Sequence, residues 1–346
     1  MAARVLGTTL ILWLFCSSAL ALDGTLLVSN RSGGSISFID LTTGVEIARI
    51  PIGPIIPHEV AVSPDGRLAL TAEYGPNSDP GRRVILIDVA TASVVGRIDL
   101  GPDSRPHTAR FLPDGQHAVA TMQDSDQVAL LELGSMQVVR KYPTGGREGH
   151  MVRLSPDGSR AYVTSRGAAG TLSVIFLNEE RAPVVIETGE GAEGISVTPD
   201  GSEVWVANRR VESISIIDTE SLEVVATLGS RPFAGRIEMS LDGRAIVPNG
   251  TSSEQVPQYL RVFDVESREM LSEVPLRDGQ PQAGNFGVLI HDGVAFVSDP
   301  RAGTIQTFDL DTMNATMNER TVLVANHEAP DGMAWTPVRV SVMTQP

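Results

Sequence analysis

Residues Gly194 to Leu228 read GISVTPDGSEVWVANRRVESISIIDTESLEVVATL, and this stretch decides the fold class. Four short apolar runs, rich in β-branched residues, begin at Ile195, Val204, Ile214 and Val224. Polar turns separate the runs, the first of them at Pro199-Asp200-Gly201, and this pattern predicts a meander of four antiparallel strands. One such meander cannot bury its own faces, so the fold depends on whether the unit recurs.

The unit recurs along the whole chain. Aspartate-glycine turns mark six copies, at Asp65-Gly66, Asp114-Gly115, Asp157-Gly158, Asp200-Gly201, Asp242-Gly243 and Asp292-Gly293. The end of the third run marks seven copies, at Asp40, Asp88, Glu132, Phe176, Asp218, Asp264 and Asp309. A period of about 45 residues with four strands per unit is typical of propeller blades. The sequence therefore predicts an all-β fold, a seven-bladed β-propeller.

The ends of the chain indicate how the ring closes. Residues 1–21 have a positive Arg4, an apolar run and a small-residue site at Ala19-Leu20-Ala21, which predicts a cleaved signal peptide. Residues 22–346 then form a single domain that begins with the second strand of a blade. Because the segment Gly332 to Thr336 resembles a first strand, we expect it to pair beside Thr25 to Ser29 and so close the propeller.

Composition excludes some classes of partner. The net charge is −15, and becomes −16 when Arg4 is removed, so nonspecific binding to nucleic acid or anionic lipid is not expected. The apolar run of the leader is too short to span a membrane. Cys16, the only cysteine, lies in the leader, which leaves no disulfide or thiolate chemistry in the mature chain. We expect an exported monomer, periplasmic or secreted.

Several segments resemble the YVTN family of β-propeller repeats. They are Ala161-Tyr-Val-Thr-Ser165, Val206-Ala-Asn208 and Ser215-Ile-Ile-Asp218, together with the Ser-Pro-Asp-Gly and Thr-Pro-Asp-Gly turns. The resemblance covers nearly all of the mature chain and implies a propeller of the superfamily that includes haem-d1 and lactonase domains. It indicates the fold and leaves the function open, because propellers have many unrelated activities.

One position in each repeat does not repeat. The residue seven positions before each turn aspartate lies just ahead of the innermost strand, at the mouth of the central channel, and its identity changes from blade to blade: His58, His107, His150, Glu193, Gly235, Asn285 and, by alignment, Asp331. Histidines with carboxylates are ligands for a divalent transition metal. The predicted metal set is therefore His58, His107, His150, Glu193 and Asp331; the simpler alternative is a polar, water-filled channel mouth.

Charged side chains in loops on the same face predict a site for an anion. They are Arg31, Glu73, Arg105, Arg147, Arg166 and Arg209. Guanidinium groups beside histidines suit a carboxylate or phosphate ligand. For any single arginine, a solvated loop or an ion pair is the simpler role.

Two kinds of function remain open from sequence. The first is an exported binding or scaffold protein that holds a small anion, a metal or a periplasmic protein partner at the channel mouth. The second, implied by the family resemblance, is a metal-dependent, lactonase-like hydrolase or a propeller that carries a redox cofactor, since haem-d1 propellers contact haem with histidines of this face. The sequence does not decide whether the protein is an enzyme.

Overall fold

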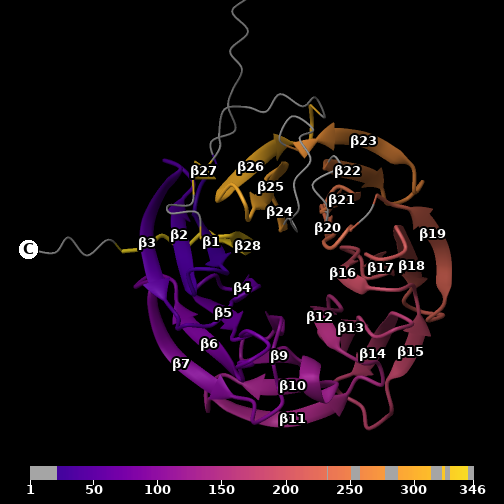
Figure 1. The fold of residues 1–346 in the computed structure, drawn as a ribbon, viewed down its shortest axis with the longest axis horizontal. Coiled ribbons are helices and arrows are strands. Elements are labelled where there is room, and N and C mark those ends of the chain that lie inside the picture. Colours follow the sequence, from indigo (N-terminus) through magenta and orange to yellow (C-terminus); the bar gives the residue numbers. More distant parts are fainter. Residues whose placement is uncertain are drawn as a thin grey trace, which may run out of the picture.

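The computed structural model describes residues 22–231, 233–250, 258–276, 287–312, 322–323 and 328–341. These residues form seven antiparallel sheets of four strands around a central axis (Figure 1). The seven-bladed propeller is therefore confirmed. The predicted signal peptide, Asn285 and most of the loop around residues 250–257 lie outside the described residues.

Each blade runs outward from its first strand, which lies nearest the axis (Figure 1). The first three blades comprise β28 (Pro330–Thr336), β1 (Thr25–Asn30), β2 (Ser35–Asp40) and β3 (Val45–Pro51); β4 (Val60–Val62), β5 (Leu68–Ala72), β6 (Arg83–Asp88) and β7 (Ser93–Asp99); and β8 (Ala109–Phe111), β9 (His117–Met122), β10 (Gln127–Glu132) and β11 (Gln137–Pro143). A single 3-10 turn, η1 (Gln123–Ser125), joins β9 to β10 in the third blade.

The remaining four blades have the same order. They comprise β12 (Gly149–Leu154), β13 (Arg160–Ser165), β14 (Thr171–Phe176) and β15 (Val184–Glu187); β16 (Ala192–Val197), β17 (Glu203–Asn208), β18 (Ser213–Asp218) and β19 (Val224–Gly229); β20 (Glu238–Met239), β21 (Arg244–Pro248), β22 (Tyr259–Asp264) and β23 (Met270–Pro275); and β24 (Val288–His291), β25 (Val294–Asp299), β26 (Thr304–Asp309) and β27 (Val322–Leu323). The four runs that decided the fold class are the strands of the fifth blade.

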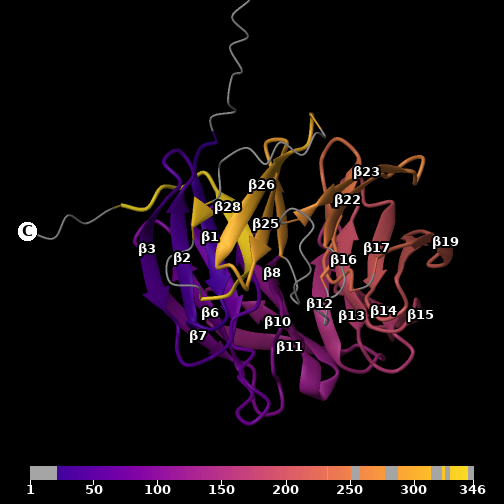
Figure 2. The same ribbon diagram turned by 45° about the horizontal axis from the view of Figure 1, so that its top comes forward.

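The ring closes where the C-terminal strand joins the first blade. β28 pairs with β1 in antiparallel register, Leu27 opposite Ala334 and Thr25 opposite Thr336. Figure 2 shows this yellow strand beside the indigo strands of the N-terminal end. The predicted pairing of Gly332–Thr336 with Thr25–Ser29 is confirmed, and no sheet edge is left at the junction.

The apolar core consists of seven clusters, one between each pair of adjacent blades. Both faces of a middle strand are therefore buried, which explains why the second and third strands are continuous apolar runs. Trp205 in β17 is fully buried between the fifth and sixth blades. The outermost strands have exposed valines such as Val95 and Val139, because only one of their faces meets a neighbouring blade.

The Asp-Gly turns also connect neighbouring blades. The Asp157 carboxylate accepts hydrogen bonds from the Ser155 hydroxyl and the Ser159 backbone, which fixes the turn between β12 and β13. Gly158 has a left-handed φ of 71°, and a Cβ built on it would lie 2.6 Å from Pro113 of the preceding blade. The turn thus repeats because of its own geometry and because of its packing on the turn of the preceding blade.

Candidate functional site

The innermost strands place the non-repeating residues around one cavity. Its volume is about 430 Å³, and it opens at the end of the channel where the first strands begin. All five residues of the predicted metal set line it: His58, His107, His150, Glu193 and Asp331. We call this cavity the mouth cavity. Sequence reasoning therefore located the residues that share it.

The three histidines form a continuous row across adjacent blades. The ring centroids of His58 and His107 are 4.6 Å apart, and those of His107 and His150 are 3.6 Å apart. The Tyr74 ring, 4.7 Å from His58 and 5.2 Å from His107, packs edge-on against the row. The row forms one wall of the mouth cavity.

Each imidazole is oriented through its Nδ1 atom. Nδ1 of His58 lies 3.0 Å from the Asp331 carboxylate, that of His107 lies 3.1 Å from the Thr108 hydroxyl, and that of His150 lies 3.1 Å from the Gln123 side-chain oxygen. The carboxylate and the amide oxygen each accept a hydrogen bond, from Nδ1–H of His58 and of His150 respectively. In the neutral ring, this tautomer leaves Nε2 with a lone pair.

The histidines are held neutral near pH 7. Burial lowers the pKa of His107 and His150 well below the ordinary value, and neighbouring histidines and arginines lower it further. Burial also lowers the pKa of His58, although Asp331 opposes the shift. The row therefore adds little charge to the mouth cavity at neutral pH.

Two buried carboxylates face the row. Asp331 lies 3.3 Å from Arg236 and 3.6 Å from Arg31, and Glu193 lies 2.9 Å from Arg209. Burial acts to raise the pKa of Asp331, but Arg236, His58 and Arg31 outweigh it and lower that pKa to about 2. Both side chains are almost fully buried, and the arginines keep Asp331 ionised.

Arg236 lines the mouth cavity and pairs with three carboxylates. Its guanidinium is 2.9 Å from Glu59, 3.3 Å from Asp331 and 3.6 Å from Glu193, which come from three different blades. Burial opposes its charge, yet these three carboxylates raise its pKa above the ordinary arginine value. A guanidinium thus occupies the centre on which the carboxylates converge.

The mouth cavity has an excess of positive charge. Its lining contains Arg31, Arg105, Arg166, Arg209 and Arg236, five guanidiniums against the carboxylates of Glu193 and Asp331. The Arg105 guanidinium stacks 4.4 Å above the Tyr74 ring and lies 3.9 Å from Asp124 outside the lining. In the described part of the chain, Nε of Arg105 and of Arg166 is buried without a hydrogen-bond acceptor.

Two residues of the predicted anion set lie elsewhere. Glu73 lines a separate cleft of about 700 Å³ beside Arg82 and Arg97, where burial raises its pKa and Arg83 lies 3.8 Å away. Arg147 is exposed, and it does not belong to the lining of the mouth cavity. The structure therefore brings together four of the six, Arg31, Arg105, Arg166 and Arg209.

The described residues contain no group of three or more His, Cys, Asp or Glu side chains arranged to hold one metal ion. Arg236 contacts both Glu193 and Asp331, so their oxygens are directed at a guanidinium. A bare metal ion bound by the predicted set would have to displace these ion pairs. The five-residue metal site stays a prediction.

Arg236 and Tyr74 were missed by sequence reasoning. The signal for Arg236 was present at the position directly after the non-repeating ring position. The other described blades have Glu59, Thr108, Met151, Gly194 and Gly332 there. Arg236 precedes β20, and a charged residue at a position as buried as this one is unusual. Tyr74 follows the second strand of its blade and gave no comparable signal.

Comparisons of sequence show similarity to two curated proteins. Protein NirF of Pseudomonas aeruginosa is 25% identical over 285 residues, which cover 75% of this chain and 69% of NirF. Protein NirF of Stutzerimonas stutzeri is 22% identical over 283 residues, which cover 74% of this chain and 68% of that protein. No family model matches the chain, so the likeness to YVTN repeats stays a resemblance.

Solved structures support the same architecture. A chain of hydrazine synthase from Kuenenia stuttgartiensis superposes with a TM-score of 0.64 at 19% identity, covering 81% of this chain and 86% of that chain. A functionally unknown protein from Desulfotomaculum acetoxidans superposes with a TM-score of 0.70 at 20% identity, covering 91% of this chain and 99% of that chain. These similarities concern the fold. Across the described ranges, no helix has the length and apolar character needed to cross a membrane.

Proposed function

We propose that this protein binds a small molecule with two or more acidic groups in the mouth cavity. The observation that carries the proposal is the excess of three guanidiniums over carboxylates in a cavity of about 430 Å³. The rest of the chain is acidic, with a net charge of −15, so this local reversal attracts anions to one place. The volume lies within the range of about 300–1,000 Å³ that is usual for small-molecule sites.

The roles of the side chains follow from their contacts. Arg105 and Arg166 are the arginines best placed to pair with the ligand. Each of them, like Arg236, keeps a buried Nε–H without an acceptor in the described chain, but Arg236 is already paired with three carboxylates. Arg31 already contacts Asp331, and Arg209 already contacts Glu193. These two arginines would therefore hold the buried carboxylates in place as well as contact the ligand. The sequence of residues 1–21 extends the proposal to an exported protein that meets its ligand in the periplasm or outside the cell.

Isothermal titration calorimetry with citrate, at fixed ionic strength, tests this proposal. We expect citrate to bind, tricarballylate to bind comparably, and Arg105→Gln or Arg166→Gln to weaken each by about tenfold or more, since each loses a charge-assisted hydrogen bond. Arg140→Gln, on an outer strand, is the matched control and should leave binding unchanged. Equal affinity in the wild type and both mouth variants would refute the proposal.

A second function is favoured by the contact between Asp331 and His58. A carboxylate that accepts from Nδ1 fixes the tautomer whose Nε2 can ligate a metal, and this pairing is common behind metal-bound histidines. The resemblance to haem-d1 propellers gives a candidate group, a metallo-tetrapyrrole with carboxylate side chains. His58 would hold its metal and the arginines its carboxylates; the bound group would supply redox chemistry.

Absorbance titration with haemin separates the two functions. If His58 ligates the iron, the Soret band should shift in the wild type, and the shift should be lost in His58→Ala and kept in His117→Ala, which alters a histidine away from the mouth cavity. A haemin spectrum that is the same in His58→Ala and the wild type would eliminate the second function and leave the citrate result intact.

A further inference from the structure

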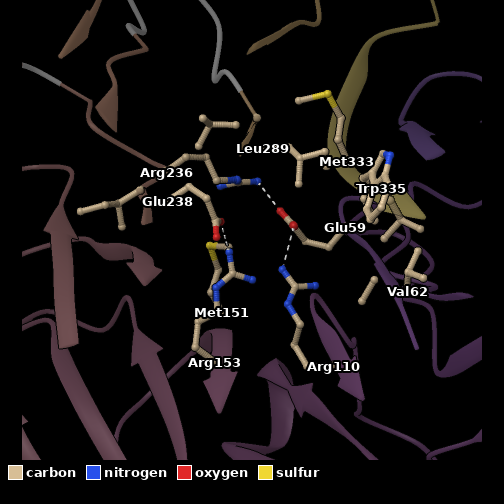
Figure 3. Close-up of a pocket in the computed structure, with 17 residues that line it drawn as sticks. Glu59, Val62, Arg110, Met151, Arg153, Arg236, Glu238, Leu289, Met333 and Trp335 are labelled. Carbon is tan, nitrogen blue, oxygen red and sulfur yellow. Dashed lines mark hydrogen bonds and ion pairs between the residues drawn. The ribbon is translucent and has the colours of Figure 1, made fainter. Parts of the chain in front are cut away.

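A second cavity lies in the channel on the far side of Arg236. Its volume is about 230 Å³, and among the residues that the structure describes, Arg236 is the one that it shares with the mouth cavity. Figure 3 shows Arg236 and Arg110 directed at Glu59, the pair Arg153–Glu238 beside them, and Leu289, Met333 and Trp335 on the opposite wall. We call this space the inner cavity.

The charges of the inner cavity come from the innermost strands. Arg110, Arg153 and Glu238 occupy the same position of the first strand in the third, fourth and sixth blades, where the second blade has Ala61 and the fifth has Ser196. Arginine at this position is therefore not required by the scaffold. The two arginines instead give adjacent blades a cationic wall.

The cationic wall is incompletely neutralised. Arg153 pairs with Glu238 at 2.5 Å, whereas Arg110 makes only long contacts, 3.4 Å to Glu59 and 3.2 Å to the Ala109 carbonyl. Glu59 is also the partner of Arg236, at 2.9 Å. Burial, followed by the nearby Arg153, lowers the pKa of Arg110 to about 10. The pKa of Arg236 is raised by its carboxylate partners, whereas that of Arg110 is lowered. Arg110 is therefore the guanidinium that is not fully paired with carboxylates.

The opposite wall of the inner cavity is apolar. Leu289, Met333 and Trp335 line it, whereas Met151 lies beside Arg153 (Figure 3). Solvent reaches the cavity past Arg153 and Glu238, whose side chains are 20% and 25% exposed. A cavity of this size with one cationic wall and one apolar wall selects a ligand with the same two parts.

We propose that the inner cavity binds a short-chain organic monocarboxylate, with its carboxylate at Arg110 and Arg153 and its alkyl part against Leu289 and Met333. The proposal does not depend on a ligand in the mouth cavity. The two sites differ in charge. Arg236 is already counted in the mouth cavity, and the rest of the inner cavity has two arginines and two glutamates. Arg110, whose contacts are long, is therefore left to pair with a single carboxylate.

Fluorescence and calorimetry with sodium butyrate, on the full mature chain at fixed ionic strength, test the inner cavity. Trp335 lines it, while Trp205 is buried between two blades, so butyrate should change the emission of the wild type and not that of Trp335→Phe. Arg110→Gln should weaken butyrate binding by about tenfold, because a charge-assisted contact is lost. Ala61→Leu should abolish binding by filling the cavity without changing its charge.

Matched controls locate the site. Arg166→Gln, in the mouth cavity, and Arg140→Gln, on an outer strand, should each leave the butyrate affinity within about twofold of the wild type, as expected for independent distant positions. The proposal is overturned if the wild type does not bind butyrate, if Ala61→Leu binds it as well as the wild type, or if Arg166→Gln is the variant that loses it. Nitrate binding as tightly as butyrate would overturn the organic part of the proposal.

Discussion

Arg236 shows how one side chain organises the centre of a propeller. Its guanidinium joins carboxylates of the first, second and fifth blades, and all four side chains are at least nine-tenths buried. Buried charges of this kind are tolerated only while each has a partner. Arg236 therefore stabilises the arrangement of the mouth cavity as well as separating it from the inner cavity.

Removing this charge should be strongly destabilising. Arg236→Gln leaves Glu59, Asp331 and Glu193 with too few partners, and we expect the free energy of unfolding to fall by about 3–5 kcal/mol. Urea denaturation measures it. Arg140→Gln breaks an exposed pair with Glu180 and should cost less than about 1 kcal/mol. Similar losses in both variants would contradict the central role of Arg236.

The buried histidines predict a specific pH dependence of stability. Because their pKa values are lowered in the folded chain, the unfolded chain binds more protons as the pH falls through about 6.5. The free energy of unfolding should therefore decrease from pH 7 toward pH 5, by at most about 1.4 kcal/mol per pH unit for each histidine. His107→Asn should give a shallower slope in denaturation measured at pH 7, 6 and 5; an unchanged slope would mean that His107 is not held neutral by the fold.

Residue-scale prediction from sequence succeeded where a position departed from the repeat. His58, His107, His150, Glu193 and Asp331 do share one cavity. The prediction was incomplete where a contact depends on the direction of a side chain. Arg236, which follows the ring position Gly235, lines the mouth cavity, and Glu73 lines a different cleft. Loop residues such as Arg147 do not belong to a strand with a regular alternation of side chains, so the direction of their side chains could not be deduced from their spacing in the sequence.

At the scale of the element, each Pro-Asp-Gly turn packs against the corresponding turn of the blade that precedes it in the sequence. The turn glycine of one blade packs on the turn proline of the preceding blade, Gly158 on Pro113 and Gly201 on Pro156. The hydrogen bonds of Asp157 and Asp200 show that these aspartates fix the geometry of the turns. The contact between turns was not visible in any single repeat.

The chain contains a matched pair of glycines for measuring this contact. Gly201 has a φ of 78° and its added Cβ would lie 2.9 Å from Pro156; Gly243 has a φ of 84° and no atom within 4 Å. Gly243→Ala should cost about 1–2 kcal/mol from backbone strain alone. Gly201→Ala should cost about 1–3 kcal/mol more in thermal or urea unfolding, because overpacking is added. Equal costs would show that the turns do not support one another.

At the scale of the molecule, the fold was predictable because the same unit recurs seven times. Each copy repeats the strand and turn signals, so a weak local signal becomes decisive when it returns about every 45 residues. The closure by β28 followed from the missing first strand at the N-terminal end. Function could not be deduced in the same way, because the residues that line the two cavities are those without a repeat.

Closure also predicts the behaviour of a shortened chain. Deleting residues 330–346 exposes the edge of β1, removes Asp331 and opens the cluster between the first and seventh blades. We expect this chain to lose its cooperative thermal transition. A peptide of residues 328–341 added in trans should restore the transition by β-strand addition, and the same peptide with Met333→Asp should not. A shortened chain that unfolds like the wild type would show that closure is dispensable.

Arg236 also bears on where a ligand of the mouth cavity could be exchanged. Among the described residues, it is the one side chain that lines both the mouth cavity and the inner cavity. A ligand bound in the mouth cavity as proposed would be exchanged through its open end, where Arg31, Arg105, Arg166 and Arg209 lie. A second protein that covered this end would therefore keep further ligand out for as long as it stayed bound.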